Sequence, residues 1–308
     1  MSRPFRFGVS LLTPASAAEW RAKCRRAEEL GYDVITVADH LGMPAPFPSL
    51  VAAAEATERP RLGTFVLNAA FWNPTLLARE VATTNALTGG RLELGLGTGY
   101  VPSEHETAGL PWGTARERVD RLRHTVEELG RILGPLGSGL VPHVPPRPGG
   151  EASGPPTAPE PRVPLLIGAN GDRMLRIAAE HADIVSFTGA RTRQDGTLEP
   201  ITAGELDERV ALYRKAAASR VEPAELNLLI QIVGVTEDRG AAIRPWLPRI
   251  PHLTEPQVLD LPVVLVGTVE QIVEQVRARR ERFGFSYLTV LEPNLEAFAP
   301  VVRELRGR

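Results

Sequence analysis

His40 and Tyr100 are the two residues of this sequence whose types best suit proton transfer to or from a bound molecule. His40 follows the apolar run Val34 to Val37 and Asp39. Because an unperturbed imidazole has a pKa of about 6.5, it can donate or accept a proton near neutral pH. We predict His40 as a catalytic residue, with a structural histidine in a strand-end hydrogen-bond network as the alternative. Tyr100 could donate a hydrogen bond to a polarised substrate or simply line the pocket.

Glycines at positions 95, 97 and 99 form the first glycine-rich segment that could meet a ligand. Gly95, Gly97 and Gly99 alternate across the end of a short apolar run, where residues without Cβ atoms let a cofactor approach main-chain N–H groups. The dinucleotide fingerprint fails here, because Tyr100 stands where Gly or Ala should and Pro102 follows where a helix should begin. A tight junction between strand and loop, without a ligand, is the alternative.

A second glycine-rich segment consists of Gly168, Ala169, Asn170 and Gly171, directly before a helical pattern that starts at Asp172. Such a loop presents backbone N–H groups and the positive end of a helix to a phosphate or carboxylate. The segment therefore predicts a phosphorylated cofactor.

Composition and charge narrow the class of protein. The chain has 308 residues, 43% of them apolar, and a net charge of −2, which favours a globular enzyme and neither a nucleic-acid nor a membrane partner. Cys24 is its single cysteine, so no disulfide or cysteine metal site is expected. No apolar run approaches the ~20 residues of a membrane helix, and we expect a cytoplasmic protein. We interpret Glu104, His105 and Glu106 as a solvated loop rather than metal ligands, and predict no metal.

Strand and helix patterns alternate along the chain and must position these residues. Helical patterns lie between most of the strand patterns, which cover 6–12, 34–37, 62–67, 92–96, 165–169, 184–187, 227–235 and 286–291. Eight such units in one chain of this length predict a (β/α)8 TIM barrel, with an open doubly wound sheet as the alternative. A segment rich in Pro and Gly, about 134–164, reads as an insertion between the fourth and fifth strands of a single domain that covers 1–308.

In a barrel of this type, functional residues follow the C-terminal ends of the strands. The residues at those positions are Thr13, Asp39, His40, Asn68, Gly97 to Tyr100, Gly168 to Gly171 and Phe187 to Gly189. Both glycine-rich segments therefore face the same rim.

Several motifs together resemble the luciferase-like family of flavin and deazaflavin oxidoreductases. They are the run Asn73, Pro74, Leu76, Leu77, Ala78, Arg79, Glu80, the segment Gly89 to Leu92, the alternating glycines, Asp39 with His40, Ile167 to Gly171, and Val266 to Thr268. Within the family, the opening Phe5 to Val9 and the segment Gly63 to Asn68 look most like the branch that uses coenzyme F420, a 5-deazaflavin.

The resemblance implies a role for each strand exit. The third exit would pack behind the tricyclic ring, often through a non-prolyl cis peptide; Asp39 would approach one edge of the ring, the fourth exit would pass the ribityl chain, and the fifth would meet the phosphate. The cofactor-binding residues implied in this way are Asp39, Phe65, Val66, Leu67, Asn68, Gly97, Thr98, Gly99, Gly168, Ala169, Asn170 and Gly171.

One departure concerns the substrate. Relatives that oxidise glucose 6-phosphate carry Glu after the third glycine and Trp four residues past the histidine, where this chain has Tyr100 and Pro44. Its only lysines are Lys23 and Lys215, which weakens a lysine-based grip on a phosphate.

The resemblance therefore implies an F420-dependent oxidoreductase that moves a hydride between the deazaflavin and a small organic substrate, more as a reductase than as a dehydrogenase. An FMN-dependent monooxygenase of the same fold is one alternative, and a noncatalytic flavin-binding barrel is another. A homodimer is also implied.

Overall fold

Eight parallel strands pair in a closed ring within the residues that this computed structural model describes, which are 3–134, 162–193 and 197–308. The strands, in their order around the ring, are β3 (Arg61–Thr64), β2 (Val34–Val37), β1 (Arg6–Leu11), β13 (Phe285–Leu291), β10 (Glu225–Ile230), β7 (Ile184–Phe187), β6 (Leu165–Gly168) and β5 (Leu92–Gly97). Pairing of β3 with β5 closes the barrel. The predicted TIM barrel is confirmed, and the alternative of an open sheet is wrong.

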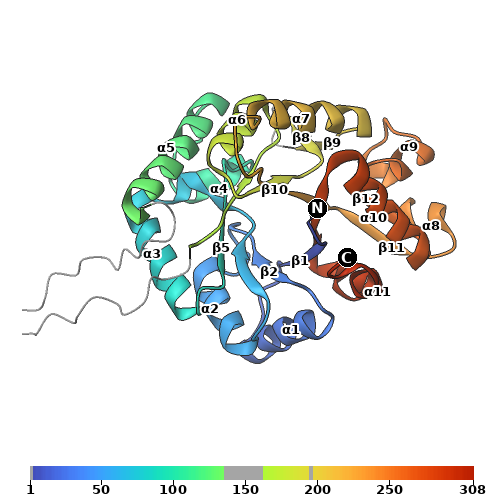
Figure 1. Ribbon diagram of the computed structural model, residues 1–308, viewed down its shortest axis with the longest axis horizontal. Coiled ribbons are helices and arrows are strands. Elements are labelled where there is room, and N and C mark those ends of the chain that lie inside the picture. Colours follow the sequence, from blue (N-terminus) through green and yellow to red (C-terminus); the bar gives the residue numbers. More distant parts are fainter. Residues whose placement is uncertain (1–2, 135–161, 194–196) are drawn as a thin grey trace, which may run out of the picture.

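Helices surround this barrel (Figure 1). The longer ones are α1 (Ala17–Glu29), α2 (Pro46–Ala56), α3 (Pro74–Leu87), α5 (Ala115–Leu133), α6 (Asp172–His181), α7 (Ala203–Ala216), α10 (Val269–Phe283) and α11 (Leu295–Leu305). Capping boxes at Ser16, Thr114, Thr202 and Thr268 satisfy backbone N–H groups at four of the helix starts. Pro74 at the first position of α3 is one reason why its start was predictable.

Two predicted strands are interrupted in the structure. The strand predicted at 62–67 divides into β3 and the short β4 (Leu67–Asn68), with a cis peptide bond between Phe65 and Val66. The strand predicted at 227–235 divides at Gln231 into β10 and β11 (Ile232–Val235). Strand β11 leaves the barrel and pairs with β12 (Val264–Gly267), a strand that the sequence analysis missed.

Shorter helices, strands and turns lie at the rim and on the outside of the barrel. They are α4 (Pro102–Thr107), α8 (Arg239–Ile243), α9 (Glu255–Leu259), the antiparallel pair β8 (Ala190–Thr192) and β9 (Leu198–Pro200), and three 3₁₀ turns at Ala69–Phe71, Leu247–Arg249 and Glu292–Asn294. The insertion predicted at about 134–164 falls mostly outside the described residues. None of the helices in the described ranges is long and apolar enough to cross a membrane.

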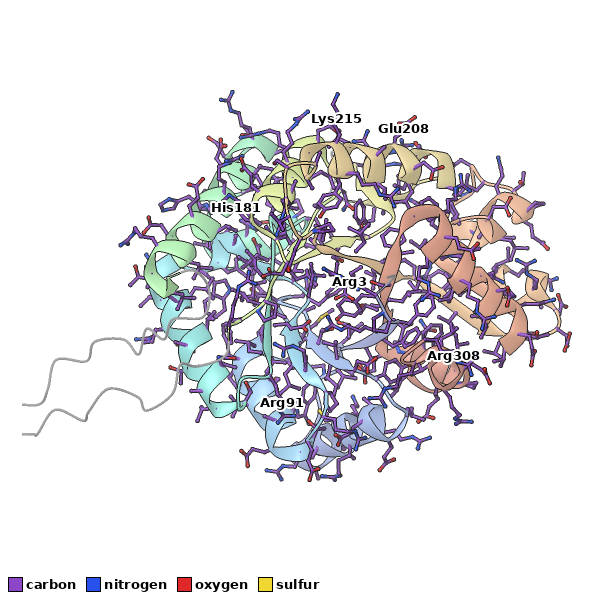
Figure 2. All side chains as sticks on the ribbon, viewed as in Figure 1. Arg3, Arg91, His181, Glu208, Lys215 and Arg308 are labelled. Carbon is purple, nitrogen blue, oxygen red and sulfur yellow. The ribbon has the colours of Figure 1, made fainter. Side chains whose placement is uncertain are left out.

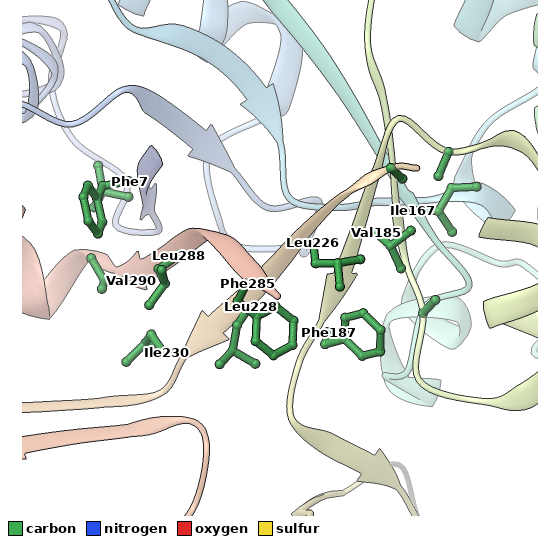
Figure 3. Packing of buried hydrophobic residues seen from close by; sticks show 14 of the residues in the cluster. Phe7, Ile167, Val185, Phe187, Leu226, Leu228, Ile230, Phe285, Leu288 and Val290 are labelled. Carbon is green, nitrogen blue, oxygen red and sulfur yellow. The ribbon is translucent and has the colours of Figure 1, made fainter. Parts of the chain in front are cut away.

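The apolar core lies mainly between the strands and the helices. On β1, the side chains of Phe7, Val9 and Leu11 belong to the main apolar cluster. The ring of Phe7 packs edge to face against Phe298 of α11, with ring centroids 5.7 Å apart. Figure 3 shows side chains of neighbouring strands in one layer, among them Phe187 and Phe285, whose ring centroids are 5.5 Å apart. Because strand side chains alternate, the residues between these apolar ones point into the barrel.

The N-terminal end of the barrel interior is closed by ion pairs. Arg6 contacts the carboxylates of Glu93 and Glu225, each at 2.6 Å, and Arg61 contacts Glu93 at 2.7 Å. Burial raises the pKa of Glu225, although Arg6 acts in the opposite direction. The charged side chains Arg6, Arg61, Glu93 and Glu225 are therefore paired with one another at this end of the barrel.

Candidate functional site

A cavity of about 310 Å³ opens at the C-terminal ends of the barrel strands. The predicted site residues that line it are Asp39, His40, Phe65, Val66, Leu67, Asn68, Gly97, Thr98, Gly99, Tyr100, Gly168 and Asn170. They come from β2, β3, β4, β5 and β6 and the loops that follow these strands. The structure thus brings together all but two of the predicted site residues.

Ala169 and Gly171 are the two that do not line the cavity. Ala169 is fully buried, and its N–H donates to the carbonyl of Ser186 in β7. Gly171 is the N-cap of α6. Of the predicted phosphate-binding segment, Gly168 and Asn170 therefore line the cavity, and Ala169 and Gly171 lie outside its lining.

His40 is paired with the carboxylate of Glu104, a residue that was predicted to lie in a solvated loop. Its Nδ1 lies 2.9 Å from Oε1 and 3.1 Å from Oε2 of Glu104, and the Leu41 N–H donates to the same Oε1 at 3.2 Å. Because a carboxylate only accepts hydrogen bonds, the Nδ1–H tautomer of His40 fits this contact. Glu104 therefore holds the imidazole through one ring nitrogen and leaves Nε2 for exchange of a proton.

Glu104 lies in the first turn of α4, a helix that starts at Pro102. His105, the next residue, is only 1% exposed; its Nε2 lies 3.0 Å from the Asn68 amide nitrogen and its Nδ1 lies 3.1 Å from the Pro111 carbonyl oxygen. The prediction of a solvated loop is therefore wrong for both residues. Pro102, a favoured residue at the start of a helix, was the local signal for α4.

Tyr100 packs against His40 in an edge-to-face arrangement, with ring centroids 5.3 Å apart. Burial raises the pKa of the Tyr100 phenol, and the charge of Glu104 raises it further. The phenol is therefore protonated at neutral pH and can donate a hydrogen bond.

Asp39 connects the end of β2 to the segment after β3. Its Oδ2 accepts hydrogen bonds from the Asn68 N–H at 3.2 Å and from the Trp72 indole N–H at 2.9 Å. Burial raises the pKa of the Asp39 carboxyl, and these two hydrogen bonds act in the opposite direction. Trp72 also packs edge to face against Phe47, with ring centroids 5.2 Å apart.

The alternating glycines make room mainly for the chain itself. A Cβ on Gly95 would lie 2.0 Å from the carbonyl oxygen of Thr64, and one on Gly97 would lie 2.6 Å from Cγ2 of Val66. Gly99 has φ +70°, and a Cβ there would lie 2.5 Å from the amide nitrogen of Asn68. These three positions therefore allow the segment 64–68 to pack against β5. Gly168 differs from these three, because an added Cβ there would lie at an ordinary contact distance of 3.8 Å from Leu96 and Val66.

A hydrogen-bonded pair joins the ends of β6 and β7 at the rim. The Thr188 hydroxyl donates to Oδ1 of Asn170 at 3.0 Å, and the Thr188 N–H donates to the same oxygen at 3.3 Å. Asn170 is thereby fixed in the cavity wall, and its amide N–H₂ group can donate to a ligand.

Part of the cavity lining was not predicted. The residues concerned are Leu12, Leu229 and Leu291, together with the polar Ser10, Ser186 and Gln231. In the sequence these leucines look like core residues. Their position at or just after strand ends was the only available signal.

Comparison with known proteins identifies the fold family. A family model described as luciferase-like monooxygenase matches residues 1–247. The F420-dependent glucose-6-phosphate dehydrogenase of Rhodococcus hoagii is 29% identical over 280 residues, which cover 82% of this chain and 76% of that protein. The protein of the same name from Intrasporangium calvum is 41% identical over 118 residues, so the match spans only 35% of each chain.

A solved structure of an F420-dependent secondary alcohol dehydrogenase in complex with an F420-acetone adduct has the same fold, with a TM-score of 0.73 over 98% of both chains at 14% identity. The family model covers 247 of the 308 residues. The resemblance found in the sequence is therefore confirmed, and the chain belongs to the luciferase-like monooxygenase family.

Proposed function

We propose that the protein is an F420-dependent oxidoreductase that transfers a hydride between the deazaflavin and a small organic substrate, acting more as a reductase than as a dehydrogenase. The pairing of His40 with Glu104 at the edge of the cavity is the observation that carries the proposal. It provides an oriented proton donor or acceptor beside a cavity that has backbone-lined and apolar walls. The names of the curated relatives support the same cofactor.

The wall formed by β3, β4, β5 and β6 fits a flat tricyclic ring. Phe65 and Val66, joined by the cis peptide bond, line the cavity, and Gly168 lines it beside Val66. Asp39 and Asn68 would meet one edge of the ring, Gly97, Thr98 and Gly99 the ribityl chain, and Gly168 and Asn170 the region of the phosphate. When bound, F420 supplies the donor or acceptor of the hydride at C5.

The chain's own residues supply the proton. Glu104 accepts the Nδ1–H hydrogen bond of His40, so that Nε2 can give a proton to the substrate in the direction of reduction or take one in the direction of oxidation. The Tyr100 phenol, protonated and packed on the imidazole, can donate a hydrogen bond to a polarised substrate oxygen or nitrogen. We also propose a homodimer, on the resemblance alone, and a cytoplasmic location, on the sequence expectation stated above.

Titration of the purified protein with oxidised F420, reduced F420 and FMN tests the proposal. We expect F420 to bind with a micromolar or lower Kd, measured by the change in deazaflavin fluorescence, and to be turned over with at least one member of a panel of enones, imines and ketones. Binding of FMN without binding of F420 would overturn the proposal and favour an FMN-dependent monooxygenase. Binding of F420 without turnover of any panel member would favour a noncatalytic flavin-binding barrel.

A further inference from the structure

Three neighbouring strands of the barrel give the cavity an apolar wall. Leu12 follows β1, Leu291 ends β13 and Leu229 lies near the end of β10, and these strands are adjacent in the order β1, β13, β10. Met43 and Leu198 add to the apolar lining. This wall is distinct from the one formed by β3, β4, β5 and β6, where the cofactor is proposed to bind. Ser10 of β1 and Gln231 after β10 also line this side, so the substrate side of the cavity combines a hydrocarbon surface with a few neutral polar groups.

The charged residues of the cavity are acidic. Among the described residues that line it, Asp39 and Glu104 are carboxylates, and none is a lysine or an arginine. Both carboxylates are already engaged: Asp39 accepts from Trp72 and Asn68, and Glu104 contacts His40. Neither carboxylate needs a cationic substrate as its partner.

Neither of the two lysines of the chain lines the cavity. Lys23 pairs with Glu292 at 2.6 Å, and the same Glu292 accepts from the backbone N–H groups of Leu12 and Thr13. Lys215 lies on the outer side of α7, away from the barrel (Figure 2).

The β8–β9 pair, which contributes Leu198 to the cavity, also carries arginines that are already paired. Arg191 and Arg193 contact the two carboxylate oxygens of Glu199 at 2.7 and 2.6 Å.

From these observations we infer that the substrate is a neutral, largely apolar molecule with one polar end, such as an enone, and not a sugar phosphate. The inference rests on the proposed function and specifies its substrate. A phosphate dianion on this side of the cavity would lose water beside two carboxylates and the apolar wall, with no lysine or arginine among the described lining residues to pair with it, which is strongly unfavourable. The polar end of a neutral substrate faces His40 and Tyr100, and its hydrocarbon part contacts Leu12, Leu229 and Leu291.

For an enone the reaction balances with reduced F420 as the reductant. The enone gains a hydride at its β-carbon and a proton at its α-carbon as the C=C π bond breaks, and F420 is oxidised by two electrons. His40 delivers the proton and recovers one from solvent.

The test compares 2-cyclohexen-1-one with glucose 6-phosphate on the full-length protein. We expect cyclohexenone to oxidise reduced F420 in an enzyme-dependent reaction. We expect millimolar glucose 6-phosphate neither to reduce oxidised F420 nor to raise the Tm of the F420-loaded protein. The inference is overturned if glucose 6-phosphate is turned over or binds saturably, or if cyclohexenone neither reacts nor changes the fluorescence of bound F420. Failure of F420 itself to bind would refute the proposed function instead, so the two failures are distinguishable.

A pair of variants locates the substrate. Leu229→Arg places a cation in the apolar wall and should raise the KM for cyclohexenone at least tenfold, whereas Leu229→Met, which keeps the wall apolar, should raise it less. The Kd for F420 serves as the check on folding for both. Val221, 99% exposed and outside the cavity lining, provides the control Val221→Arg, which should leave KM unchanged. Equal KM values in Leu229→Arg and the wild type would contradict the inference.

Discussion

Nδ1 of His40 and Oε1 of Glu104 lie 2.9 Å apart, although 64 positions separate the two residues in the sequence. The contact joins the loop after β2 to the short helix α4 that follows β5. It fixes the ring orientation of the predicted proton donor, and it depends on the barrel, which brings the ends of these two strands to the same rim.

Replacement of His40 by alanine should lower turnover while it leaves the cofactor bound. Proton transfer by a positioned side chain contributes roughly 10²- to 10⁴-fold to a rate, so we expect kcat to fall by about that factor for His40→Ala. The Kd for F420, measured by fluorescence, should change little. Full turnover in His40→Ala would remove His40 from the chemistry and leave it as a structural histidine of the strand end.

Glu104 acts on the reaction through His40, so its two variants should differ. Glu104→Gln keeps an oxygen that can accept from Nδ1–H, whereas Glu104→Ala removes the acceptor and frees the ring to rotate. We expect kcat to fall about tenfold more for Glu104→Ala than for Glu104→Gln, as one lost hydrogen bond to a charged group is worth roughly 1.5 kcal/mol or more. Steady-state kinetics with saturating F420 give kcat for both variants. The same kcat in Glu104→Ala and Glu104→Gln would argue that the contact with His40 is merely structural.

The pH dependence of stability should change when Asp39 is replaced. A carboxyl whose pKa is raised on folding holds its proton more tightly in the folded state than in the unfolded state. Its favourable contribution is present when it is protonated and is lost as the pH rises through the raised pKa. The unfolding free energy of the wild type should therefore increase relative to that of Asp39→Asn as the pH is lowered from neutral toward the ordinary aspartate pKa of about 3.9.

Urea unfolding at a series of pH values measures this difference. Asp120→Asn, which removes a carboxylate that is 50% exposed, controls for the loss of one surface charge. A difference between the wild type and Asp39→Asn that is constant with pH, or of opposite sign, would contradict the raised pKa.

An alanine at position 97 should disturb the cavity wall through Val66. The added Cβ would lie 2.6 Å from Cγ2 of Val66, and overpacking of this kind costs about 1–3 kcal/mol. We expect Gly97→Ala to lose stability in this range and to weaken F420 binding, because Val66 must move in the wall. Gly130→Ala is the matched control: nothing lies within 4 Å of its added Cβ, and alanine inside helix α5 should stabilise by about 0.5–1 kcal/mol. Unchanged stability and F420 binding in Gly97→Ala would show that Val66 adapts freely.

Removal of Arg6 should destabilise the barrel from its N-terminal end. Arg6→Met leaves the carboxylates of Glu93 and Glu225, which are 4% and 6% exposed, without this partner, and the loss of one side of a buried ion pair costs about 3–5 kcal/mol. Arg26→Met, which breaks an exposed contact with Glu296, should leave the Tm nearly unchanged. Chemical denaturation measures the free energy of unfolding of both variants. Equal values for Arg6→Met and Arg26→Met would contradict the role of Arg6.

The sequence alone determined the repeating strand and helix pattern and the end of the barrel at which the candidate site residues lie. Strand β2 and strand β7 were predicted with the observed bounds, because a short apolar run bounded by polar residues leaves little choice. His40, Asn68 and Gly97 were predicted as candidate site residues from their place after such runs, and all three line the cavity.

Tertiary structure decided the contacts that no local pattern encodes. In the sequence, Glu104 and His105 look like an exposed acid and an exposed histidine. Closure of the barrel instead places α4 at the rim, where Glu104 contacts His40 and His105 contacts Asn68. The glycines Gly95 and Gly97 suggested open backbone for a ligand, whereas packing fills their space with Thr64 and Val66. Side-chain type and spacing report on burial and periodicity, but the partners of a residue depend on which strand ends the closed barrel sets side by side.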